Sequence, residues 1–199
     1  SYIGSRSALG TLPPDALQNA NRVDTGRTLG DHMRSAGCNP DALKEGNVFL
    51  PPDSLRAYLE VHIEQGPVLE EAEVPVAIVT GIRGNRRLPK ATCIGEYSHC
   101  GGVPRSHRRD SVIATAELVS YLDQVWEECE KEGKDFAFTV GKFFTDPEWH
   151  AMTKISGNVE FSLDMRSLDG GFVDSMVGRV KAEAEKIARR RGVTFDLGE

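Results

Sequence analysis

The chain has 199 residues, of which 39% are hydrophobic and 27% are charged, and its formal net charge at pH 7 is −6. This is ordinary globular composition, sufficient for one domain and part of another. The acidic balance argues against a nucleic-acid surface, and no apolar run approaches the length needed to span a bilayer. The basic run Arg189 to Arg191 closes a helical pattern before Gly192, where cations favour the helix dipole and no partner is required.

The cysteines indicate a reducing compartment. Cys38, Cys93, Cys100 and Cys129 form no CxxC pair and no disulfide-framework spacing, and no signal-peptide pattern opens the chain. We therefore expect a soluble, cytoplasmic protein. Because the chain begins without an initiator Met and ends within a strand-like pattern, we also expect it to be a piece of a longer protein.

The first 54 residues are typical of loop and short helix, with one helix predicted over residues 28–35. A strand is predicted over residues 58–64, where Leu59, Val61 and Ile63 would face a core. His62 would lie on the opposite face between two glutamates, which makes it a candidate metal ligand. The alternative is an edge strand whose polar face is solvated. Gly-Pro punctuation follows, and a short helix is predicted from Pro67.

The pattern then becomes regular. Extended segments are predicted over residues 76–82 and 86–96, followed by a helix over 110–131, strands over 136–144 and 157–167, a helix over 172–191 and a strand from residue 193. From about residue 82 the order is β-α-β-β-α-β. This order predicts an α+β domain of the split βαβ type, with helices on one face of an antiparallel sheet.

Two further polar features could carry chemistry. His99 precedes Cys100-Gly101-Gly102, where the backbone is free to approach a ligand, so its imidazole could stabilise an oxyanion or simply hydrogen-bond within the turn. Arg166 lies on the polar face of its strand, where its planar fork could bind a carboxylate or pair with Asp164. The spacing of the Cys and His residues does not favour a structural zinc site.

Five motifs occur in a recognisable order: "GSRSALGTL" near the start, "HIEQGPVLE", "GNRRL", "GEYSHCGGVPRSHRRDS" and "VEFSLDMRSLD". Together they resemble the hydantoinase/carbamoylase branch of the M20 metal-dependent amidohydrolases. This branch includes N-carbamoyl-L-amino-acid hydrolases, β-ureidopropionase and allantoate amidohydrolase. The resemblance covers nearly the whole chain.

The resemblance implies a dinuclear-metal catalytic α/β domain interrupted by a ferredoxin-like βαββαβ dimerisation or lid domain. Residues 1–81 would be the last part of the first catalytic segment, and residues 82–199 the inserted domain, through which the protein would form a homodimer. The implied site residues are His62 as a metal ligand, His99 as a catalytic residue acting in the partner's active site, Arg166 as the group that binds the substrate carboxylate, and Gln65 and Arg86 as substrate-lining residues.

The implied reaction is hydrolysis of a C–N bond in an N-carbamoyl or ureido acid by two divalent cations, Zn, Mn, Ni or Co, with a glutamate as base. That base and the other expected ligands are not recognisable in this chain. One imidazole cannot form a dinuclear site, so we expect the 199-residue chain alone to bind no catalytic metal and to be inactive.

Two departures leave the substrate open. Relatives usually have His-Ala-Gly-Thr-Thr-Pro where this chain has His99-Cys100-Gly101-Gly102-Val103-Pro104, and commonly an Asn where it has Thr153. Thr lacks the paired donor and acceptor of an amide. Alternative readings are an M20 peptidase or aminoacylase, and a dimerisation or ligand-binding module without catalysis.

Overall fold

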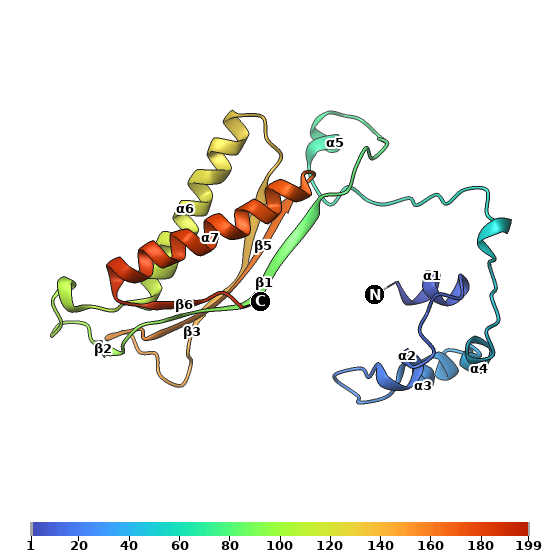
Figure 1. Cartoon of the computed structure of the whole chain (residues 1–199), viewed down its shortest axis with the longest axis horizontal. Coiled ribbons are helices and arrows are strands. Elements are labelled where there is room, and N and C mark those ends of the chain that lie inside the picture. Colours follow the sequence, from blue (N-terminus) through green and yellow to red (C-terminus); the bar gives the residue numbers. More distant parts are fainter. Residues whose placement is uncertain (1, 199) are drawn as a thin grey trace. The chain divides into compact units, whose positions relative to one another are not determined.

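The computed structural model describes residues 2–198, and the chain divides into two compact units, Ser1–Pro75 and Val76–Glu199 (Figure 1). The first unit contains short helices only: α1 (Ile3–Ala8), α2 (Ala16–Asn19), α3 (Leu29–Ser35), α4 (Pro40–Lys44), the 3₁₀ turn η1 (Pro52–Ser54) and α5 (Val68–Glu71). The helix predicted over 28–35 is confirmed as α3. Thr28 caps it, because its hydroxyl accepts the backbone N–H of Asp31 at 3.1 Å.

The strand predicted over residues 58–64 is not formed among the described residues, and the same holds for residues 76–82. The side chains expected to face a core are exposed: Leu59 is 90%, Val61 103% and Ile63 76% accessible. A strand is stabilised by pairing and by burial of one face, and this segment has neither here. The alternating pattern of apolar and polar residues is therefore present in this segment, but the strand that it predicts does not form in this chain.

The second unit is α+β, as predicted. Its antiparallel sheet has the strand order β3-β5-β1-β6, formed by β1 (Gly84–Ile94), β3 (Ala137–Thr145), β5 (Asn158–Ser167) and β6 (Thr194–Asp196). Figure 1 shows α6 (Ser111–Lys131) and α7 (Gly170–Arg191) on one side of this sheet. The chain follows the predicted β-α-β-β-α-β order. It also contains a small two-stranded sheet, β2 (Ser98–His99) with β4 (Lys154–Ile155), and a 3₁₀ turn, η2 (Arg105–His107).

The core lies between the sheet and the two helices. Alternate residues of β5, namely Val159, Phe161, Leu163 and Met165, are at most 2% exposed, and they pack with Leu118 and Leu122 of α6 and with Met176, Val180 and Ile187 of α7. The other face of the sheet carries the polar residues of the same strands. None of the described helices is long and apolar enough to cross a membrane.

The helix α6 begins and ends where the sequence predicts, whereas α7 ends as predicted at Arg191 but begins at Gly170, two residues before the predicted start. The Asp110 carboxylate accepts the N–H groups of Val112 and Ile113 at 3.0 and 3.1 Å, which begins α6. Gly192 ends α7 in the left-handed conformation, with φ of 66°. These caps fix where the loop before α6 ends and where the arginines at the end of α7 lie.

Candidate functional site

His62 lies in the exposed segment of the first unit. Its Nδ1 is 2.5 Å from the carbonyl oxygen of Ile63. Because a carbonyl only accepts, Nδ1 of the neutral ring is the donor, which leaves the Nε2 lone pair open toward solvent. This is the tautomer that a metal-binding imidazole requires, since the ring nitrogen opposite the metal usually donates to a carbonyl or carboxylate.

The described residues do not complete a metal site around His62. No group of three or more His, Cys, Asp or Glu side chains gathers anywhere in residues 2–198. The neighbouring Glu64 is engaged elsewhere, because its carboxylate accepts the N–H of Leu69 at 3.0 and 3.1 Å. His62 therefore fits the role of one ligand within a larger set, and this chain alone does not fit a two-metal centre.

Gln65 lies immediately after the His62 segment, at a bend with unusual backbone geometry. Its φ is 59°, in the left-handed region that costs a non-glycine residue about 1–2 kcal/mol. The exposed side chain is thereby directed by a turn rather than by a strand or helix. Strain of this kind is often retained where a side chain must be aimed.

His99 is fixed by the small β2–β4 sheet. It pairs with Lys154, and the N–H of the next residue, Cys100, donates to the Thr153 carbonyl at 3.1 Å. The Gly101 N–H donates to His99 Nδ1 at 3.1 Å. In the neutral ring Nδ1 is therefore the acceptor, and Nε2 carries the proton. His62 thus presents a lone pair and His99 presents a donor, which are the different groups needed for metal binding and oxyanion stabilisation.

Four residues that sequence reasoning did not single out support the His99 loop. Arg108 donates to the carbonyls of Val103, at 2.9 Å, and Cys100, so it holds the glycine-containing turn closed. The Lys154 ammonium lies 5.9 Å from the Tyr97 ring centroid and 5.8 Å from that of Trp149. The contact between Lys154 and Tyr97 joins positions far apart in sequence, which no local pattern could have revealed, whereas the contacts of Arg108 and the one between Lys154 and Trp149 lie within a few residues.

Arg166 lies near the end of β5 on the polar face of the sheet. Its Nε and Nη2 donate to the Asp164 carboxylate at 3.1 and 3.0 Å, and Arg87 of β1 donates to the same carboxylate at 3.1 Å. The pKa of Asp164 lies below its ordinary value. The hydrogen bond from Arg166 is the main cause and the bond from Arg87 adds to it, while desolvation opposes part of the shift. The pairing that sequence analysis weighed as an alternative is therefore present, and it still leaves one edge of the guanidinium open.

Arg86 is not brought together with Arg166. Its register partner on β5 is Met165, a fully buried residue on the helix-facing side, and its guanidinium pairs with Asp174 of α7 at 2.6 Å. Arg166 lies on the opposite face. Arg86 and Arg166 of one chain thus lie on opposite faces of the sheet, because successive strand residues alternate faces and their registers differ by one.

His99 and Arg166 also lie apart. His99 pairs with β4, just before β5 begins, whereas Arg166 is near the other end of β5 (Figure 1). The eight steps from Asn158 to Arg166 span roughly 26 Å at about 3.3 Å per residue. One small substrate could not contact both residues of the same chain.

The chain is similar in sequence to known amidohydrolases and deiminases. The chain is 40% identical over 191 residues to N-carbamoyl-L-amino acid amidohydrolase of Geobacillus stearothermophilus, an alignment covering 96% of this chain and 44% of that protein. It is 36% identical over 191 residues to a probable allantoate deiminase of Oryza sativa subsp. japonica, covering 89% and 38%. No family model matches the chain.

A solved structure is also similar to this chain. The crystal structure of an amidase of the hydantoinase/carbamoylase family from Burkholderia phymatum matches with a TM-score of 0.80 and 29% identity, over 98% of this chain and 46% of that one. The chain thus spans less than half the length of each of these proteins. Its homologues are carbamoylases and allantoate-hydrolysing enzymes, and its structural neighbours are hydantoinase/carbamoylase amidases, which confirms the resemblance stated from the motifs.

Proposed function

We propose that this chain is part of a metal-dependent amidohydrolase that hydrolyses the C–N bond of an N-carbamoyl amino acid or a ureido acid such as allantoate. The products would include ammonia, with CO₂ where the carbamoyl group is cleaved. The observation that carries this proposal is the 40% identity over 191 residues to a carbamoylase. The aligned part of the chain contains the motifs around His62, His99 and Arg166.

In this proposal, residues 1–81 are the last part of a catalytic segment and residues 82–199 form a dimerisation or lid domain. The division into units at residues 75 and 76, and the β-α-β-β-α-β order of the second, support this assignment. His62 would be one ligand of two divalent cations, Zn, Mn, Ni or Co, whose remaining ligands lie outside this chain. The open Nε2 lone pair supports that role.

His99 would act in the active site of a second copy. Two observations support this: its Nε2–H faces outward as a donor, and a strand length separates it from Arg166 of its own chain. Arg166 would bind the substrate carboxylate through the guanidinium edge that Asp164 does not occupy. Gln65 would line the same site. Arg86 lies on the face of the sheet opposite Arg166, so it would not share that site with Arg166 of its own chain.

The test is an ammonia-release assay on the complete protein encoded by the gene, loaded in turn with Zn, Mn, Ni and Co. The substrates are N-carbamoyl-L-amino acids, ureidopropionate and allantoate, with N-acetyl amino acids and dipeptides as comparisons. We expect ammonia from at least one of the first three. Hydrolysis of only the acetyl or peptide substrates would identify a peptidase or aminoacylase instead.

A further inference from the structure

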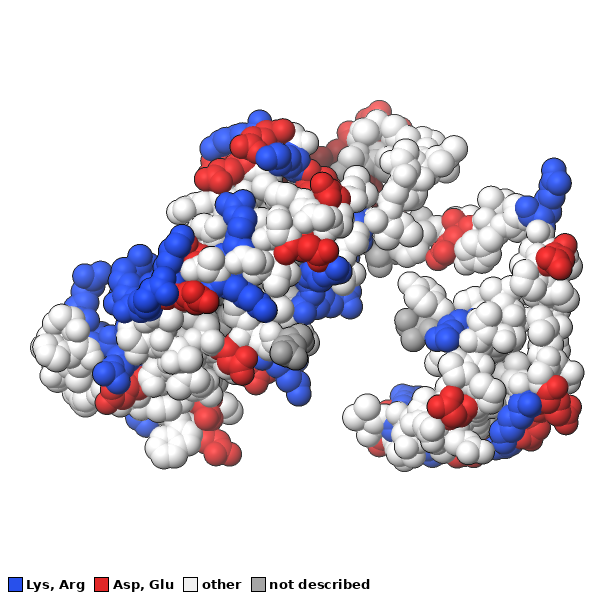
Figure 2. All heavy atoms as spheres, in the orientation of Figure 1, with Lys and Arg blue, Asp and Glu red and all other residues white. Residues whose placement is uncertain are grey.

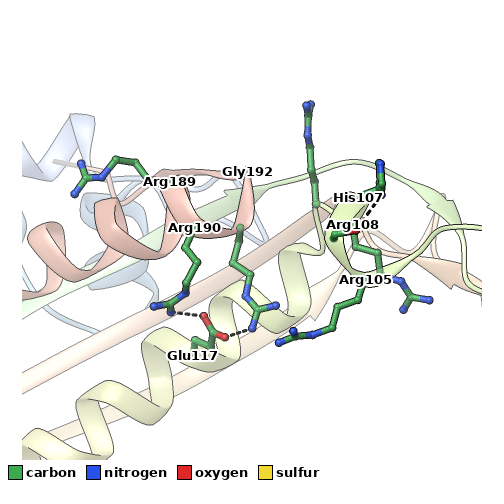
Figure 3. A pocket seen from close by; sticks show the side chains of 10 residues that line it. Arg105, His107, Arg108, Glu117, Arg189, Arg190 and Gly192 are labelled. Atoms are coloured by element: carbon green, nitrogen blue, oxygen red, sulfur yellow. Dashed lines mark hydrogen bonds and ion pairs between the residues drawn. The ribbon is translucent and has the colours of Figure 1, made fainter.

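A basic pocket of about 900 Å³ lies in the second unit. None of the proposed site residues lines it, although Arg108, which supports the His99 loop, does. It is formed where the loop around η2 meets the C-terminal end of α7 and one residue of α6 (Figure 3). Figure 2 shows basic side chains gathered over this end of α7. Six arginines line it: Arg105, Arg108, Arg109, Arg189, Arg190 and Arg191.

The carboxylates near the pocket do not balance these charges. Glu117 pairs with both Arg190, at 2.8 Å, and Arg191. Glu96 lies 3.6 Å from Arg109, and Glu185 lies 3.8 Å from Arg189, both at the long end of the ion-pair range. Asp110 is nearby but caps α6. Arg105 and Arg108 form no ion pair within residues 2–198, so the pocket keeps a positive excess in a chain of net charge −6.

The helix dipole accounts for the arginines at the end of α7 but not for those of the loop around η2. Arg189, Arg190 and Arg191 are favourable at the end of α7. The loop arginines come from another element, and Figure 3 shows Arg105 extending toward the side on which Glu117 lies, whereas Arg189 points away. Bringing like charges together costs free energy unless an anion compensates them. The Nε of Arg191 is moreover buried without a hydrogen-bond partner.

The lining defines the class of ligand. Guanidinium groups bind phosphate and carboxylate oxygens in a planar fork, and Ser106 adds a hydroxyl donor. The lining residues include no Phe, Tyr or Trp, so the pocket lacks the large aromatic rings on which nucleobases usually stack. Six arginines against the four carboxylates Glu117, Glu96, Glu185 and Asp110 leave an excess of two positive charges, which favours an anion that carries more than one negative charge, as phosphate does near pH 7.

We propose that this pocket binds a small, multiply charged anion through its phosphate group, and that Glu117 competes with the anion for Arg190 and Arg191. The phosphate could be inorganic or part of a small metabolite. The proposal does not depend on the hydrolytic function proposed above. It predicts a site in the 199-residue chain itself, which can be measured without any enzymatic turnover.

The test is calorimetric titration of the chain with inorganic phosphate, pyrophosphate, glycerol phosphate and citrate at a constant 0.15 M NaCl. Saturable binding of one phosphate-bearing anion per chain is expected, and glycerol phosphate binding more tightly than inorganic phosphate would identify an organic source. Arg105→Gln and Arg190→Gln should each weaken binding by about fivefold or more. Lys131→Gln removes one charge at the far end of α6 and should leave binding unchanged. Circular dichroism verifies that each variant is folded.

The Glu117→Gln variant distinguishes a ligand-binding pocket from a cluster of charges whose role is only structural. Because it frees both helix arginines from their carboxylate, it should tighten phosphate binding severalfold, whereas a purely structural role predicts no gain. Three results would overturn the proposal: no saturable binding of any phosphate-bearing probe, equal weakening by Lys131→Gln, or tighter binding of citrate than of every phosphate-bearing probe.

Discussion

Asp164 and Arg166 form a side-on ion pair, in which Nε and Nη2 of the arginine donate to the two carboxylate oxygens at 3.1 and 3.0 Å. A guanidinium has a second edge, formed by Nη1 and the other hydrogen of Nη2. Because Arg87 donates to the same carboxylate from β1, Asp164 is itself held in place. Asp164 therefore orients Arg166 with its second edge open on the polar face of the sheet.

Replacing Arg166 by Lys in the complete enzyme should raise KM for the carboxylate-bearing substrate by about tenfold. Lysine keeps the charge but loses both the fork that would bind a substrate carboxylate and the one that pairs with Asp164. Steady-state kinetics measure the change, and Arg22→Lys, at an exposed pair with Asp24, is the matched control. An unchanged KM would remove Arg166 from the substrate site.

The second unit could be predicted closely because its sequence pattern and its burial coincide. Every apolar position that the alternation predicts for β5 is buried. In α7 the helical pattern predicts five buried positions, of which Met176, Val180, Ala184 and Ile187 are buried and Phe172 is only partly buried. In α6 the helical pattern places Ile113 on the same side as Leu118 and Leu122, but Ile113 is 44% exposed. Its neighbours Ser111 and Ala114 are fully buried, so Ile113 is exposed because of its direction around the helix: it lies about 140° from Leu118 at 100° per residue.

The first unit and the site could be predicted only in part. Residues 58–64 have a strand pattern, but a strand forms only when a partner is available, and local sequence does not specify that partner. Motifs located His99 and Arg166, but not the distance between them. The side of the sheet on which Arg86 lies depends on its register with Met165, a nonlocal property.

Gly157→Ala should destabilise the second unit by about 1–3 kcal/mol, since an added methyl would lie 2.6 Å from the Tyr97 ring and 2.7 Å from its backbone nitrogen. Gly178→Ala on α7 meets nothing within 4 Å and should instead stabilise by up to about 1 kcal/mol. Both tryptophans, Trp126 and Trp149, lie in this unit, so their fluorescence during urea unfolding reports on it. Equal effects of the two substitutions would show that the close approach is not rigid.

The stability contributed by Glu117 should depend on pH. The hydrogen bond from Arg191, reinforced by Arg190, lowers the pKa of Glu117 from 4.5 to about 2. Since the folded-state value is the lower one, the contribution is complete above about pH 4.5 and is lost as the pH falls toward 2. We expect Glu117→Gln to cost about 1–2 kcal/mol at pH 7 and much less at pH 2.5, measured by urea unfolding. A cost that is the same at both pH values would contradict this.

His62→Ala in the complete enzyme should reduce bound metal, because the Nε2 lone pair of His62 is proposed as a ligand. Elemental analysis after dialysis measures the metal, and His32→Ala, at a partly buried position of α3, is the control. The isolated 199-residue chain should retain no stoichiometric metal, since one imidazole is an incomplete site. Full metal occupancy in the His62 variant would exclude the proposed role.

His99→Ala should have the opposite profile: a kcat lower by about 10²–10³-fold with metal content unchanged, as expected for the loss of one oxyanion donor. The structural reason is that His99 uses Nδ1 to accept from Gly101, which leaves Nε2–H as its only free group, a donor that cannot coordinate a cation while protonated. His107→Ala, in the neighbouring η2 turn, controls for removal of an exposed imidazole from the same loop and should retain activity. If metal occupancy fell with kcat in the His99 variant, His99 would have to be reassigned as a ligand.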